Sequence, residues 1–89
     1  MSAEPMPQTR AAILAEIRAF VANWFREGRE DGLGDDTPLV TSGIVDSAGV
    51  LEVVEFLESR FGVRITDQDV SLRNCNTLAA LTDLVESRL

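Results

Sequence analysis

Histidine and lysine are both absent from this 89-residue sequence. Without an imidazole, Ser–His and Cys–His nucleophile pairs are excluded, and most zinc sites lose their usual ligand. Without a lysine, only carboxylates remain as general acids or bases. We therefore expect a protein that is not an enzyme.

Cysteine and long apolar runs are also scarce. The single cysteine, Cys75, has no partner for an intramolecular disulfide, which fits a reducing cytoplasm. With no lysine or histidine near it, we interpret Cys75 as a small packing residue. Residues 1–8 lack a basic region followed by an apolar one, and the apolar runs fall far below the roughly 20 residues of a membrane span. We expect a cytoplasmic protein without membrane insertion.

Acidic residues are abundant. Fifteen aspartates and glutamates against eight arginines give a formal net charge of −7. Such a field repels nucleic acids and attracts proteins with basic patches. Since 45% of the residues are hydrophobic, the chain should fold as one domain over residues 9–89, behind a flexible leader at residues 1–8.

Three segments repeat apolar residues at spacings of three and four, as amphipathic helices do. The first runs from Arg10 to Phe25 behind Thr9 as N-cap, with a stripe of Ile13, Leu14, Ile17, Phe20, Val21 and Trp24. The second begins at Asp46-Ser47 and stops at Gly62, with Val50, Val53, Val54, Leu57 and Phe61. The last is capped by Asn76 and Thr77 and has Leu78, Leu81, Leu84 and Val85. We expect these stripes to form the core.

The connections complete the predicted fold. Glycines, aspartates and a proline between Arg26 and Val45 indicate a loop of unusual length, held down by Leu33, Leu39 and Ile44. Thr66 and Asp69 have capping-box spacing and predict a brief third helix. The expected fold is all-α: a four-helix bundle with a long loop between the first and second helices and a short third helix.

The junction at Asp46-Ser47 is the candidate site. Asp46 is suited to cap the helix, and a serine in the first turn projects its hydroxyl outward, where another enzyme reaches it. The same pair also suits an ordinary helix start. A hydrolase nucleophile elbow is excluded because Val45 occupies a required glycine position. The acidic segment at residues 30–36 lacks the ligand pattern of a calcium loop, so no metal site is expected.

The segment from Gly43 to Glu58, which reads GIVDSAGVLEVVEFLE, resembles the acyl carrier proteins. Asp36-Thr37-Pro38-Leu39, the Phe61–Ile65 exit and Asn76-Thr77-Leu78 are similar to that family too, so the resemblance runs from about Thr9 to Leu89. It implies that Ser47 carries a covalent 4'-phosphopantetheine arm derived from coenzyme A. It also implies that Asp46 helps a magnesium-dependent phosphopantetheinyl transferase to recognise the site.

The resemblance further implies partners that dock on the second helix. The matching positions are Ala48, Leu51, Glu52, Glu55 and Glu58, and the implied partners are an acyl- or aminoacyl-loading ligase and downstream acyltransferases with basic patches. Asp-Ser followed by Ala48-Gly49 looks more like D-alanyl and free-standing specialised carriers than like fatty-acid-synthesis carriers. Asp46 also stands where peptidyl carrier domains usually have histidine. The alternative function is an unmodified acidic helical domain that holds a protein partner.

Overall fold

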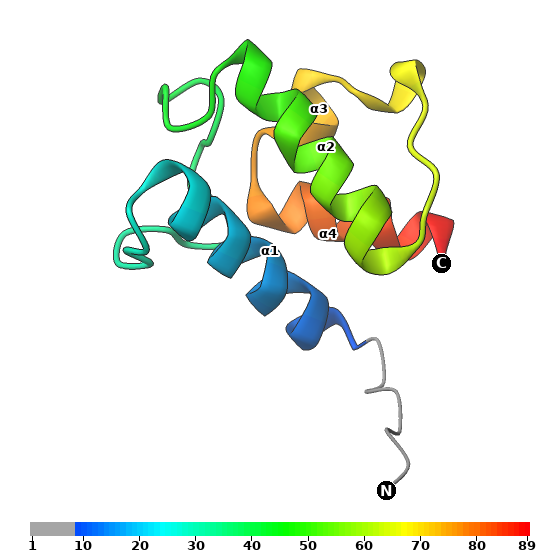
Figure 1. Cartoon of the computed structure of the whole chain (residues 1–89), viewed down its shortest axis with the longest axis horizontal. Helices are drawn as coiled ribbons and strands as arrows, with labels where there is room; N and C mark the ends of the chain where they lie inside the picture. The colour runs from blue at the N-terminus through cyan, green and yellow to red at the C-terminus, as the bar shows by residue number, and fades with distance from the viewer. Residues whose placement is uncertain (1–8) are drawn as a thin grey trace, which may run out of the picture.

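A computed structural model describes residues 9–89, and the expected leader at residues 1–8 lies outside the described part. The elements in chain order are α1 (Arg10–Phe25), α2 (Ser47–Phe61), the 3-10 helix η1 (Asp67–Asp69), α3 (Leu72–Cys75) and α4 (Leu78–Arg88). There is no β-strand among these described residues. Helix α1 packs against both α2 and α4, and α3 packs against α4 (Figure 1). The expected all-α bundle with a long first loop and a short third helix is confirmed.

The ends of the long helices lie where their capping residues predict. The Thr9 side chain accepts a hydrogen bond from the backbone N–H of Ala12, at 3.1 Å. Gly62 ends α2 in the left-handed conformation, with φ of 70°, which glycine adopts without a steric penalty. At α4 the cap is Thr77, which accepts from the Ala80 N–H at 3.0 Å. These signals need only neighbours within four residues, so they act before any tertiary packing.

The core lies where α1, α2 and α4 meet. Helix α1 contributes a stripe at four-residue spacing, and α2 and α4 contribute the inward faces that their periodicity predicts. The loop before α2 and the segment after it add further apolar residues. The buried hydrophobic set is Ile13, Ile17, Val21, Ala22, Leu33, Leu39, Val45, Val53, Val54, Leu57, Phe61, Val63, Ile65, Cys75, Leu78, Leu81, Leu84 and Val85.

Four residues that we expected in the core lie at its edge. Trp24 is 59% exposed. Leu14, Phe20 and Val50 are only half-buried. The buried side of α1 includes Ala22, on the far side of Val21 from the two aromatic residues. Periodicity identifies the apolar side of a helix but not the part of that side which neighbouring elements cover.

The third helix begins later than expected. The capping box of Thr66 and Asp69 is present, but it caps the 3-10 turn η1. Val70 then adopts an extended backbone, and α3 starts afresh after Ser71, whose side chain accepts from the Asn74 N–H at 3.2 Å. A capping box specifies only a first turn, and the chain leaves the helical conformation immediately after it.

The loop between α1 and α2 is packed rather than loose. Leu33, Leu39 and Val45 are buried along it, whereas Ile44, which we expected to hold it down, is only partly buried. Inside the loop the Val45 N–H donates to the Leu39 carbonyl at 2.9 Å. The Ala79 N–H of α4 donates to the Asp35 carbonyl at 3.0 Å, which ties the loop to the last helix.

No helix among residues 9–89 has the length and apolar character needed to cross a membrane.

Candidate functional site

Asp46 and Ser47 form the N-terminal corner of α2. Asp46 is the N-cap, with extended backbone angles, and its Oδ1 accepts the Gly49 N–H at 2.7 Å. Ser47 is the first residue of the helix and is exposed. This arrangement is the one that the sequence predicts for the pair.

The Ser47 hydroxyl differs from that of nearby Ser42. The Ser42 hydroxyl donates to the Pro38 carbonyl at 2.5 Å and accepts from the Ile44 N–H at 3.3 Å, so it forms part of the loop's own hydrogen bonding. For the Ser47 hydroxyl, no hydrogen bond is found within residues 9–89. Of the two serines, Ser47 is the one whose oxygen is available to an incoming group.

Asn76 holds the loop that leads to this corner. Its Oδ1 accepts from the Val40 N–H at 2.9 Å and from the Thr41 N–H at 3.1 Å, and its carbonyl accepts from the Leu39 N–H at 2.7 Å. We expected Asn76 to share the capping of the last helix with Thr77. Instead it fixes backbone about 35 residues away, because its side-chain oxygen reaches two donors and its carbonyl a third, and only the fold brings these together.

Gly49 allows α1 to approach α2 next to the site. A Cβ atom at this buried position would lie 2.7 Å from Cε1 and 3.0 Å from Cζ of the Phe25 ring, and 3.1 Å from Oδ1 of Asp46. Any larger residue therefore meets both the end of α1 and the capping carboxylate. The glycine that follows Ser47 by two positions has a packing role that the local sequence does not reveal.

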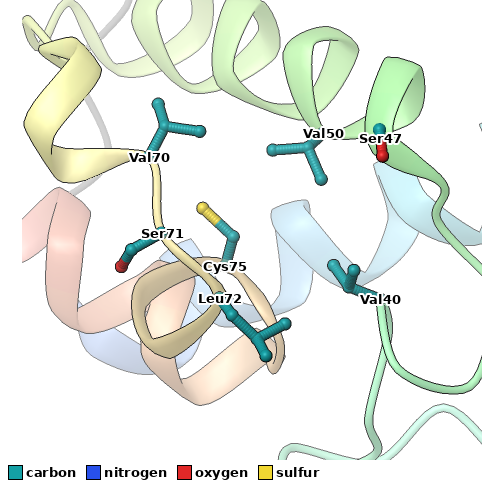
Figure 2. Close-up of a pocket in the computed structure, with 7 residues that line it drawn as sticks. All are labelled: Val40, Ser47, Val50, Val70, Ser71, Leu72 and Cys75. Carbon is teal, nitrogen blue, oxygen red and sulfur yellow. The ribbon is translucent and has the colours of Figure 1, made fainter.

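A cavity of about 240 Å³ opens beside Ser47. Its walls come from the loop, α2, the segment leading into α3 and α3 itself, as Figure 2 shows. They are formed by Val40, Ser47, Val50, Val70, Ser71, Leu72 and Cys75. Most of these side chains are apolar, and the Cys75 sulfur points into the space between Val50 and Val70 (Figure 2). The cavity suits a small apolar group rather than a charged one.

The Cys75 thiol is held in its protonated form. Burial raises the pKa of Cys75 above its ordinary value, while the hydrogen bond from the Ser71 backbone acts in the opposite direction. A thiol of this kind is a weak nucleophile because the thiolate is the reactive species. This agrees with our interpretation of Cys75 as a packing residue.

The expected docking residues fall into two groups. Ala48, Leu51, Glu52 and Glu55 are exposed along α2. Glu58 is only partly exposed, and its carboxylate accepts the Ile65 N–H at 2.9 Å. Glu58 therefore braces the segment that follows α2, a role for which the sequence offers no local signal.

Carboxylates and the cysteine do not gather into a metal centre in the described part of the chain. No group of three or more such ligands is found there. The acidic loop residue Asp35 is paired with Arg18.

Comparisons with known proteins agree on one kind of relative. A family model described as "Phosphopantetheine attachment site" matches residues 15–85, a span that includes the corner at Ser47. The chain is 36% identical over 66 residues to "Probable acyl carrier protein PigG" of Serratia sp. (strain ATCC 39006), covering 74% of this chain and 76% of that protein.

A solved structure has the same fold. Its description is "Crystal structure of FAD-dependent dehydrogenase", and one of its chains superposes with a TM-score of 0.69 and 28% sequence identity. The match covers 76% of this chain and 96% of the solved one, so the solved chain is no longer than this one.

Proposed function

The chain belongs to the phosphopantetheine-binding carrier proteins, and from this premise we propose that Ser47 is its attachment residue. The family is not catalytic and uses 4'-phosphopantetheine as its prosthetic group. The carrier function follows from the family, whereas the residue that bears the arm and the identity of the cargo are our proposals. The single observation that supports Ser47 most strongly is its exposed hydroxyl in the first turn of α2, behind the Asp46 cap.

Attachment is a phosphoryl transfer that another enzyme catalyses. The Ser47 Oγ attacks the phosphorus that bears the pantetheine, a phosphodiester bond forms, and the pyrophosphate bond of coenzyme A breaks. The adenosine bisphosphate half leaves, and the hydroxyl proton passes to a base of the transferase. The amide groups at the start of α2 and the helix dipole favour the negative phosphodiester at that position. Asp46 contributes a carboxylate at the same corner for recognition by the transferase and its metal.

The test is mass spectrometry of the intact protein after incubation with coenzyme A and a broad-specificity transferase. We expect the wild type to gain one phosphopantetheine, Ser47→Ala to gain none, and the control Ser42→Ala to be modified like the wild type. Modification of Ser47→Ala would move the arm to another residue. A wild type that stays unmodified, while a known carrier is modified in the same assay, would favour the unmodified interaction domain instead.

The cargo that we propose is a short acyl or aminoacyl group, held as a thioester on the arm's terminal thiol. Its size follows from the cavity of about 240 Å³ beside Ser47. Val40, Val50 and Val70 line it, so an apolar group that folds back there loses contact with water. The variant Val50→Phe fills the cavity and should speed the hydrolysis of short acyl thioesters on the arm. The control is the wild type loaded with the same acyl group. Equal hydrolysis rates in the two proteins would place the cargo in solvent.

The acyl-handling partners that we propose dock on the exposed side of α2. Glu52 and Glu55 supply charge for a basic patch, and Ala48 and Leu51 supply apolar contact. Exposed single ion pairs contribute only about 0–1 kcal/mol each. Acyl transfer from the loaded Glu52→Lys/Glu55→Lys variant to these enzymes should therefore be slower than from either single reversal, and salt should slow the wild type in the same way. Equal rates and equal salt slopes would contradict this docking side. We leave Glu58 out of the variant because it holds the Ile65 backbone.

One partner class is suggested by the solved chain of similar fold. That chain is too short to be a flavin-binding enzyme by itself, and its structure is named for an FAD-dependent dehydrogenase. We therefore include a dehydrogenase of that class among the candidate partners. It would take two electrons and two protons from the arm-bound cargo and reduce FAD. Flavin absorbance should fall when wild type loaded from a panel of acyl-coenzyme A donors is added and should stay constant with Ser47→Ala. Constant absorbance across the panel would exclude this partner.

A further inference from the structure

Trp24 lies on the surface, yet its ring is held in place. It is the only tryptophan of the chain and is 59% exposed. Its ring stacks on Phe20 of the same helix, with centroids 5.6 Å apart and planes inclined by 18°. Phe20 in turn stacks on Phe56 of α2 at 4.2 Å and 11°. These three rings form an ordered aromatic stack across the α1–α2 boundary.

Trp24, the exposed end of the aromatic stack, lies toward the Ser47 end of α2, whereas Phe56 lies in the second half of that helix. The two helices run antiparallel, because Phe25 meets Gly49, Phe20 meets Phe56, and an ion pair joins Glu16 to Arg60 at 2.5 Å (Figure 1). Trp24 directly precedes Phe25, so it belongs to the end of α1 that lies next to the start of α2.

A carboxylate accompanies the aromatic stack on the same face of α2. Glu52 follows Gly49 by three residues and precedes Phe56 by four, so helical spacing puts all three on the side that faces α1. Glu52 is exposed, and no ion pair of its side chain is found among residues 9–89. Other exposed carboxylates are paired: Asp83 and Glu86 of α4 both form ion pairs with Arg10 of α1.

An exposed tryptophan that is stacked on a neighbouring ring, with an exposed carboxylate on the adjoining face of α2, has a definite binding chemistry. The face of an indole ring attracts a guanidinium or ammonium group, and a carboxylate at its edge adds charge attraction. Tryptophan and arginine are also the residues that most often dominate protein interfaces. The complementary surface is therefore a protein surface that presents a basic side chain, above all arginine, among apolar ones.

We propose that the aromatic stack together with Glu52 is a docking surface for the phosphopantetheinyl transferase. The inference rests on the proposed attachment at Ser47. Enzymes that act on the cargo work at the end of the arm, whereas the transferase must bring its active site to the Ser47 oxygen itself. A standard interface covers about 800 Å² on each partner, so a footprint centred on Ser47 reaches the adjoining end of α1.

The experiment measures the steady-state kinetics of arm transfer from coenzyme A, with the carrier as the varied substrate. The variants are Trp24→Ala and Glu52→Gln. Leu89→Ala is the control for the tryptophan, since Leu89 is 58% exposed at the end of α4. Asp67→Asn is the control for the glutamate, because it removes one exposed charge from η1 rather than from α1 or α2. Circular dichroism checks the helix content of each variant.

The expected result is a KM about fivefold higher or more for Trp24→Ala, as for an interface residue that dominates binding, with kcat unchanged within about twofold. Glu52→Gln should raise KM in the same direction, and both controls should match the wild type. Glu52→Gln carries the test by itself if Trp24→Ala loses helicity.

Two other results would overturn the inference. If the wild type is modified at Ser47 and neither variant changes KM, the attachment stands and this docking surface is wrong. If the wild type sediments as a dimer and Trp24→Ala as a monomer with an unchanged KM, a second copy of the chain covers the stack instead. A wild type that is never modified removes the attachment and this inference together.

Discussion

Replacing Gly49 by alanine tests whether the close approach of Phe25 matters to the start of α2. Two effects oppose each other. Alanine in place of glycine inside a helix stabilises by up to about 1 kcal/mol. The new Cβ would lie 2.7 Å from the Phe25 ring and 3.1 Å from the capping oxygen of Asp46, and such overpacking typically costs about 1–3 kcal/mol. We expect Gly49→Ala to lower the free energy of unfolding by about 0–2 kcal/mol.

The sign of the effect should reverse when the ring is shortened. Leucine at position 25 lacks the Cε and Cζ atoms that approach Gly49 most closely. In a Phe25→Leu background the helix preference and the 3.1 Å approach to Asp46 Oδ1 remain, so Gly49→Ala should stabilise by less than about 1 kcal/mol. For a domain of this size, 1 kcal/mol corresponds to about 4–8 °C in Tm.

The assay is urea denaturation of the wild type, both single variants and the double variant, followed by helical circular dichroism at equal protein concentration. The coupling energy is the difference between the two effects of Gly49→Ala. If Gly49→Ala changes stability by the same amount and with the same sign in both backgrounds, Phe25 does not limit the space at Gly49. Our account of the α1–α2 contact beside the site would then be wrong.

Three further predictions concern the core, the loop and the thiol. Leu57→Ala should lower the free energy of unfolding, measured by urea denaturation, by about 2–5 kcal/mol because Leu57 is 0% exposed. Leu51→Ala, at a position 60% exposed, should change it by no more than about 0.5 kcal/mol. An unchanged free energy of unfolding for Leu57→Ala would contradict the placement of Leu57 in the core. Asn76→Ala should cost about 1–3 kcal/mol and speed hydrogen exchange at the Val40 and Thr41 amides, and unaltered exchange there would show that the amide does not hold the loop. In the folded protein without its arm, Cys75 should react with iodoacetamide at pH 8 far more slowly than in the protein unfolded by urea. Burial raises the pKa of Cys75, so the reactive thiolate forms only at higher pH than for a free cysteine. Equal rates in the folded and unfolded protein would refute the burial of the thiol.

Local signals in the sequence were enough for the three long helices and for the position of the candidate serine. Thr9, Asp46 and Thr77 each cap the helix that the pattern assigns to them, and Gly62 ends α2. A cap involves backbone groups two or three residues away, so its residues determine it with no help from the rest of the fold. The inward faces of α2 and α4 followed from apolar spacing for a similar reason.

The tertiary structure decided what lies next to these elements. The contact of Phe25 with Gly49 joins residues that are distant in the chain, and so do the hydrogen bonds from Val40 and Thr41 to Asn76. The exposure of Trp24 depends on how far neighbouring elements cover α1. The spacing of apolar residues that predicts a helix contains no information about those neighbours. The placement of Ser47 was therefore readable from its own helix start, while the cavity and the aromatic stack beside it exist only because α1, α2 and α3 are brought together by burial of their apolar faces.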